Sequence, residues 1–106
     1  MSEFNVTADQ VLEVLSDIID PEMHINIVDL GLIYKVNLDP EKARVEVDMT
    51  LTSPGCPIGP NLIESVKFKC SRIAGVKEVG VNLVFNPPWN PRIHATEEGQ
   101  MELGII

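Results

Sequence analysis

One residue of this sequence combines several features that favour chemistry: Cys56, in the run Pro54-Gly55-Cys56-Pro57 directly before a predicted helix. The first turn of a helix carries unpaired N–H groups and the positive end of the helix dipole, and both stabilise an anion. A thiolate is such an anion, so we expect a lowered pKa at Cys56 and a thiol that acts as a nucleophile or metal ligand. The alternative is a cysteine that merely fills a loop.

The second cysteine, Cys70, falls on the apolar stripe of the same predicted helix, where free cysteine behaves as a small hydrophobic side chain. A continuous helix between the two cysteines would separate them by roughly 21 Å, so they cannot ligate one metal ion within one chain. Two cysteines are too few for a disulfide framework, and the cytoplasm, where thiols stay reduced, is the expected location.

Three acidic residues, Asp20, Glu22 and Asp29, cluster in one predicted loop. Aspartates are common in loops because their side chains cap turns, which is one interpretation. The other places the three carboxylates around the Cys56 loop, as a polar rim or a weak set of metal ligands. Trp89 lies in a proline-rich segment and is either a lid on the edge of the core or an exposed anchor for a partner protein.

The two histidines, His24 and His94, have no ligand-type residue three or four positions away. A thiol hydrolase would need one of them as a base beside Cys56, and nothing in the spacing supports that pairing. We therefore expect ordinary loop or surface histidines and no enzymatic activity.

Helices and strands that could position these residues follow from caps and hydrophobic periodicity. Thr7 and Gln10 form a predicted capping box, and the apolar spacing behind it predicts a helix that ends near Asp20, before Pro21. Alternating apolar residues predict two hairpin strands at 34–38 and 45–51, with Thr50 facing outward. They also predict a third strand at 79–85, with Val79, Val81, Leu83 and Phe85 facing inward. A second helix is expected between Pro57 and Gly75, with Pro60 able to shift its start.

The C-terminal part is predicted to be less regular. Its prolines exclude a regular element over residues 86–91, and a short edge strand is expected around Arg92–His94. Thr96 predicts the cap of a brief helix that ends at Leu103, before Gly104. Residues 1–106 are thus one two-layer α+β domain, with helices on one face of a small, mainly antiparallel sheet.

Charge and composition exclude several classes of function. The formal net charge is −8, from 8 basic and 16 acidic residues, so the chain lacks the basic footprint that nucleic acids require. The first ten residues do not form a signal peptide, and no apolar run is long enough to span a membrane. We therefore expect no nucleic-acid partner and no membrane association.

Five sequence motifs, taken in order, resemble those of a known family: Asp20-Pro21-Glu22, Ile27-Val28-Asp29-Leu30-Gly31-Leu32-Ile33-Tyr34, Met49-Thr50-Leu51-Thr52-Ser53-Pro54-Gly55-Cys56-Pro57, Asn86-Pro87-Pro88-Trp89 and Leu103-Gly104-Ile105. The chain resembles the PaaD-like and SufT-like iron–sulfur cluster assembly domains over nearly its whole length. The resemblance implies an α+β domain with a mixed or antiparallel sheet. It also implies that Cys56 is the functional thiol and that Asp20, Glu22 and Asp29 correspond to the acidic loop residues of the family. The chain lacks the cysteine-rich extension of some phenylacetate-pathway members, which favours a general role.

Two functions remain open at this point. The first is a factor that assists delivery of iron–sulfur clusters to client apoproteins, with Cys56 holding iron or a cluster transiently and no tightly bound cofactor. Its partners would be scaffold or carrier proteins and clients, and a homodimer would supply two Cys56 thiols. The second is a metal-free adaptor that recruits clients or assembles a multicomponent oxygenase by protein contacts.

Overall fold

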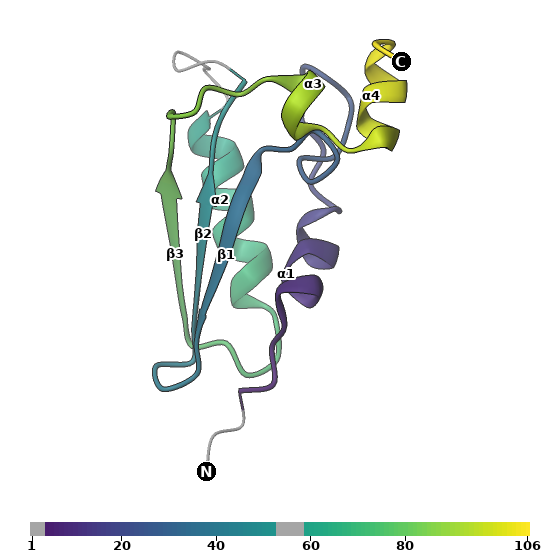
Figure 1. Ribbon diagram of the computed structural model, residues 1–106. Coiled ribbons are helices and arrows are strands. Elements are labelled where there is room, and N and C mark those ends of the chain that lie inside the picture. The colour runs from purple at the N-terminus through teal and green to yellow at the C-terminus, as the bar shows by residue number, and fades with distance from the viewer. Residues whose placement is uncertain (1–3, 53–58) are drawn as a thin grey trace.

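The computed structural model describes residues 4–52 and 59–106 of the chain. Helices and strands follow one another in this order: α1 (Ala8–Leu15), β1 (Ile33–Asp39), β2 (Arg44–Met49), α2 (Gly59–Ser71), β3 (Glu78–Leu83), α3 (Pro91–His94) and α4 (Glu97–Leu103). Figure 1 shows α1 and α2 side by side on one face of a three-stranded sheet, with α3 and α4 at one end. Within the described residues, no helix is long and apolar enough to cross a membrane.

The sheet is mixed, with strand order β1-β2-β3. β1 and β2 form the predicted antiparallel hairpin, which pairs Val36 with Val47 and Leu38 with Val45. β3 pairs with β2 in parallel, with Val79 beside Val45. The expected α+β class is therefore confirmed. The sheet was expected to be mainly antiparallel, but one of its two strand pairs, β2 with β3, is parallel. The reason is the connection: α2 returns the chain to the end of the sheet where β2 began, as a crossover helix does.

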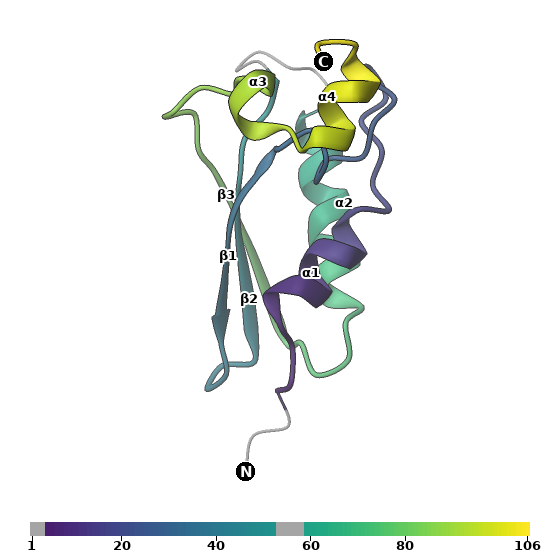
Figure 2. The same cartoon turned by 45° about the vertical axis from the view of Figure 1, so that its right-hand side comes forward.

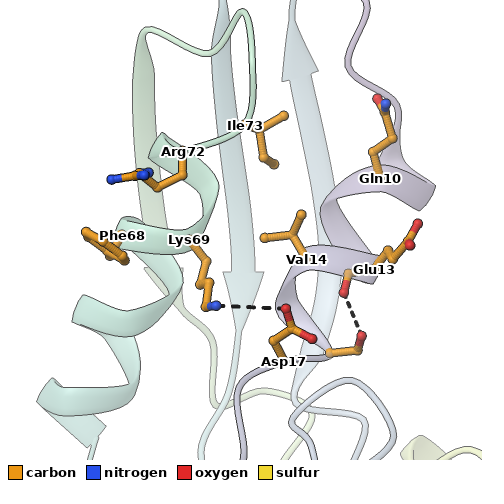
Figure 3. Close-up of a pocket in the computed structure, with 9 residues that line it drawn as sticks. Gln10, Glu13, Val14, Asp17, Phe68, Lys69, Arg72 and Ile73 are labelled. Atoms are coloured by element: carbon orange, nitrogen blue, oxygen red, sulfur yellow. Dashed lines mark hydrogen bonds and ion pairs between the residues drawn. The ribbon is translucent and has the colours of Figure 1, made fainter.

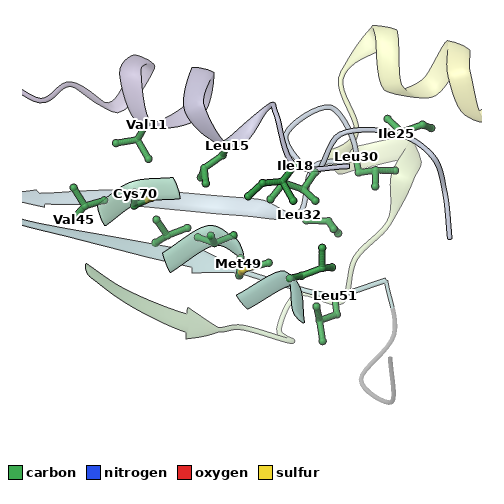
Figure 4. Close-up of a cluster of buried hydrophobic side chains, with 14 of the residues drawn as sticks. Val11, Leu15, Ile18, Ile25, Leu30, Leu32, Val45, Met49, Leu51 and Cys70 are labelled. Atoms are coloured by element: carbon green, nitrogen blue, oxygen red, sulfur yellow. The ribbon is translucent and has the colours of Figure 1, made fainter. Parts of the chain in front are cut away.

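A single core fills the space between the helices and the sheet (Figure 4). The inward residues of β2, Val45, Val47 and Met49, have no exposed surface. Cys70 of α2 is equally buried, which confirms its prediction as a core side chain. Burial raises the pKa of the Cys70 thiol to about 11, because a thiolate there would lose its hydration.

The helix ends differ from the predictions in two places. α1 ends at Leu15, well before Asp20, because the turn tightens: the N–H groups of Asp17 and Ile18 bond to carbonyls three residues back. The predicted capping box at the start of α1 is confirmed. α2 ends at Ser71, so Gly75, with φ of 92°, forms part of the following turn and not a cap.

The expected edge strand around Arg92–His94 is wrong, since Pro91–His94 is the short helix α3. The side chain of Asn90 accepts the N–H of Arg92, and Pro91 occupies the first turn, where its missing N–H costs nothing. The prediction for α4 is confirmed, with Thr96 as its N-cap and Gly104 as its left-handed C-cap at φ 76°.

The inward placement of Leu83 and Phe85 is also wrong. Both follow the alternation of Val79 and Val81, which pack against the core, yet 42% of Leu83 and 39% of Phe85 are exposed. β3 is an edge strand, with a neighbouring strand of the described chain on one side only (Figure 1).

Replacement of Cys70 tests the core. Cys70→Asp should lower the free energy of unfolding by roughly 3–5 kcal/mol at pH 7, because it buries a carboxylate with no cation beside it. Urea denaturation followed by circular dichroism measures the loss. Ser71→Asp, the exposed neighbour, is the control and should cost less than about 1 kcal/mol. Equal losses in the two variants would contradict the placement of Cys70.

Candidate functional site

Of the site residues predicted from the sequence, the loop residues Asp20, Glu22 and Asp29 and the side chain of Trp89 lie at one end of the molecule. The loop that links α1 to β1 lies there with α3 and α4, and β2 ends and α2 begins at the same end (Figures 1 and 2). Cys56 lies outside the described residues, between Thr52 and Gly59, so its prediction is not tested by the structure. The residues on both sides of that segment are described by the structure.

Asp20 organises the first half of the loop. Only 1% of its surface is exposed, and its Oδ1 accepts the N–H groups of Glu22 at 2.8 Å and Met23 at 3.2 Å. The backbone of Asp20 also bonds to His24 and Ile25. A buried carboxylate needs such donors, and Asp20 obtains them from the turn that it caps.

Asp29 joins the loop to the C-terminal helices. Its carboxylate accepts hydrogen bonds from the Asn26 amide at 2.8 Å and from the Thr96 hydroxyl at 3.0 Å. Its carbonyl oxygen accepts the Thr96 N–H at 2.8 Å. A Cβ on Gly99 would collide with this carbonyl group, so a glycine is required for α4 to approach so closely.

The structure does not bring the three acidic residues together around a metal site. Glu22 is exposed, the Asp20 carboxylate accepts hydrogen bonds from the turn that follows it, and the Asp29 carboxylate accepts them from Asn26 and Thr96. Among residues 4–52 and 59–106, no group of three His, Cys, Asp or Glu side chains is placed to hold a metal ion. The turn-capping interpretation describes Asp20, whereas Asp29 bonds to side chains.

Trp89 matches the lid interpretation of the two that the sequence left open. The side chain is half-buried against the core, and its indole Nε1 donates a hydrogen bond to the carbonyl of Leu30 at 2.7 Å. This contact holds the proline-rich segment, residues 86–91, against the connection from α1 to β1, which we call the acidic loop. The bonded carbonyl lies between Asp29 and the start of β1.

Tyr34 is a contact residue that the sequence analysis placed only as part of a strand. Its hydroxyl donates to the carbonyl of Pro87 at 2.9 Å, and its ring lies 4.9 Å from that of His94. Burial raises the pKa of Tyr34, and a hydrogen bond with the side chain of Thr50 offsets part of this rise. His94 is itself fixed, since its Nδ1 accepts the N–H of Asn90 at 2.9 Å.

Thr50 is buried, contrary to the outward position predicted by alternation. β2 ends at Met49, and the N–H of Thr50 bonds to the carbonyl of Leu32 at 2.8 Å, so the strand period no longer applies. In the sequence, the only indication that Thr50 would leave the strand alternation was its position just before the predicted loop that contains Cys56.

A groove of about 840 Å³ lies between α1 and α2, away from the acidic loop. Figure 3 shows Val14 and Ile73 between the two helices, and the Lys69 ammonium lies 3.8 Å from the Asp17 carboxylate across the groove. The residues that line it include no cysteine and no histidine, so it offers no thiolate or imidazole ligand.

Gly99→Ala tests the junction between Asp29 and α4. The added methyl group should force α4 away from the Asp29 carbonyl, so hydrogen exchange at the amides of Thr96 and Gly99 should accelerate by roughly 10–100-fold. Exchange measured by NMR gives the rates. Glu98→Ala, on the exposed side of α4, is the control; equal rates in the two variants would contradict this role of Gly99.

Comparisons with known proteins identify the family of the chain. The family model described as iron–sulfur cluster assembly protein matches residues 8–83. The chain is 40% identical over 105 residues to an Fe-S protein maturation auxiliary factor of Porphyromonas gingivalis, covering 99% of this chain and 98% of the relative. It is 53% identical over 72 residues to the maturation auxiliary factor SufT of Staphylococcus aureus, covering 68% of this chain and 81% of the relative.

The fold agrees as well. The crystal structure of a domain of unknown function from Bacillus anthracis superposes with a TM-score of 0.84 at 36% identity, over 92% of each chain. The predicted resemblance to SufT-like proteins is therefore confirmed. The chain belongs to the iron–sulfur cluster assembly protein family.

Proposed function

We propose that this protein is an iron–sulfur cluster maturation factor that assists cluster delivery to client apoproteins through the Cys56 thiolate. The observation that supports this role is the burial of the other cysteine. Cys70 has no exposed surface and a pKa raised to about 11, so it is not available as a ligand in the folded chain. Cys56 is the remaining thiol, and the family to which the chain belongs assembles iron–sulfur clusters.

One thiolate per chain suits transfer better than storage. Two-iron clusters take four thiolate-like ligands, so a cluster at Cys56 needs further ligands from a second chain, a partner protein or a small thiol. Glu22, which is exposed, and Asp20 and Asp29, whose carboxylates accept hydrogen bonds in the folded chain, are weak candidates for additional ligands. Such a site releases its cluster readily, which is what delivery requires.

The proposed role is accessory and not catalytic, as the name of the Staphylococcus aureus relative also suggests. Its partners would be scaffold or carrier proteins and client apoproteins in the cytoplasm. The competing function is a metal-free adaptor, and one observation favours it: α3 and α4 carry large apolar side chains in water, with Ile93 72% and Met101 60% exposed. These side chains could contact a client without any cluster.

Anaerobic reconstitution with iron and sulfide separates the two functions. The wild-type protein should gain about one iron per chain and the absorption of a cluster, Cys70→Ser should load equally, and Cys56→Ser should lose the signal. Iron analysis after gel filtration gives the ratio. Unchanged loading of Cys56→Ser would contradict the proposed role, and failure of the wild-type protein to load would leave the adaptor.

Timed alkylation tests the assignment of the thiols directly. At pH 8 a thiol with a pKa of about 11 is about one part in a thousand thiolate, so Cys70 should react only when the chain unfolds. Cys56 should be alkylated in the folded protein. Peptide mass mapping after brief exposure to iodoacetamide identifies the modified residue, and earlier modification of Cys70 would show the assignment to be wrong.

A further inference from the structure

We propose that two copies of this chain pair through β3, as antiparallel neighbours around a two-fold axis at Val81. The interface extends the three-stranded sheet into a continuous six-stranded one. The inference concerns the edge of the sheet at β3 and does not rest on the proposed function.

β3 has one hydrogen-bonded side and one free side. At its start, the N–H groups of Lys77 and Glu78 both bond to the Ala43 carbonyl, at 2.8 and 3.2 Å, and at its end the Val84 N–H bonds to the Met49 carbonyl at 2.8 Å. Because backbone groups alternate along a strand, the even-numbered residues of this segment bond toward β2. The N–H and C=O groups of Val79, Val81 and Leu83 therefore point to the free side, where Figure 1 shows no neighbouring strand.

This edge carries none of the usual protection against pairing. Proteins blunt sheet edges with lysines, prolines and bulges. β3 has the sequence EVGVNL, without lysine or proline. Its register with β2 is continuous over all six residues, so it contains no bulge. The opposite edge, β1, is protected by an irregularity between Ile33 and Lys35 and by the exposed lysine itself.

The strand is complementary to itself in one register. An axis at Val81 places that residue opposite Val81 of the second copy and Val79 opposite Leu83 of the second copy. The outward N–H and C=O groups then form about six hydrogen bonds. The side chains that meet on the helix-covered face are all apolar, so Leu83, which is 42% exposed in one copy, gains a cover.

Charge also favours a second copy at this edge. The net charge of −8 opposes contact between copies at most surfaces. Within β3 the one charged residue is Glu78, and its carboxylate already accepts a hydrogen bond from the Arg44 guanidinium at 3.2 Å. The proposed register places Glu78 opposite Val84 of the second copy, so no charge meets a like charge.

The interface is small, and its size limits the affinity of the dimer. Six residues of strand on each copy bury less surface than a standard interface, so the dissociation constant should lie between about 10 μM and 1 mM. A dimer of this affinity forms only in concentrated samples, so the test compares low and high protein concentrations.

Hydrogen exchange of the metal-free protein at two concentrations tests the register. Between roughly 20 μM and 1 mM protein, exchange at the amides of Val79, Val81 and Leu83 should become about two- to sixfold slower, because it follows the fraction of monomer that remains at these dissociation constants. The amides of Gly80 and Asn82 should not change, since they are bonded to β2 in each copy. Equal rates for the odd-numbered amides at both concentrations would overturn the proposal.

A matched pair of variants tests the surface. Leu83→Lys places a charge at the exposed end of β3, and it should abolish the dimer in sedimentation equilibrium and remove the concentration dependence of exchange. Ile93→Lys makes the same change at an exposed position of α3 and should leave both unchanged. A dimer that survives Leu83→Lys, or a wild-type chain that stays monomeric near 1 mM and pairs only with another protein, would show the proposal to be wrong.

Discussion

The position of β2 at the centre of the sheet is the constraint on which the rest of the structure depends. Its inward residues are fully buried, and it is bonded on both sides, antiparallel to β1 and parallel to β3. A parallel neighbour can be reached only by a crossover, so α2 must begin at the end of the sheet where β2 stops. The segment with Cys56 is therefore tied at both flanks to the acidic loop's end of the molecule (Figure 2). The same order leaves β3 at an open edge.

The acidic loop and the C-terminal segment form a second unit of interactions at that end. Asp29 bonds to Thr96, and Trp89 and Tyr34 bond across the same boundary through an indole N–H and a phenol hydroxyl. These contacts join residues more than fifty positions apart, and the one made by Trp89 is partly buried, so they hold the loop and the C-terminal segment together. The loop is thus fixed at the end of the molecule where β2 ends and α2 begins, and the proposed delivery role assigns the ligand to Cys56, between these two elements in the sequence.

Local signals in the sequence predicted local structure well. The capping box at Thr7, the hairpin and the short helix capped by Thr96 were all found, because each depends on neighbours a few residues away. The parallel pairing of β3 was not predicted, since strand direction depends on a long crossover. Thr50 was misplaced because alternation holds only while a strand lasts. For the candidate site, the sequence identified Asp29 and Trp89, but not their bonds to Thr96 and to the carbonyl of Leu30, because these contacts join residues far apart along the chain.

The most direct test of the central claim is cluster transfer. The protein, loaded under anaerobic conditions, is mixed with an apoferredoxin of the two-iron type, and the circular dichroism of the ferredoxin cluster is followed in time. Delivery through Cys56 predicts that the signal appears faster than from equal amounts of free iron and sulfide, and that a Cys56→Ser protein gives no acceleration. A loaded protein that keeps its cluster, or a Cys56→Ser protein that transfers as fast as the wild type, would contradict the claim.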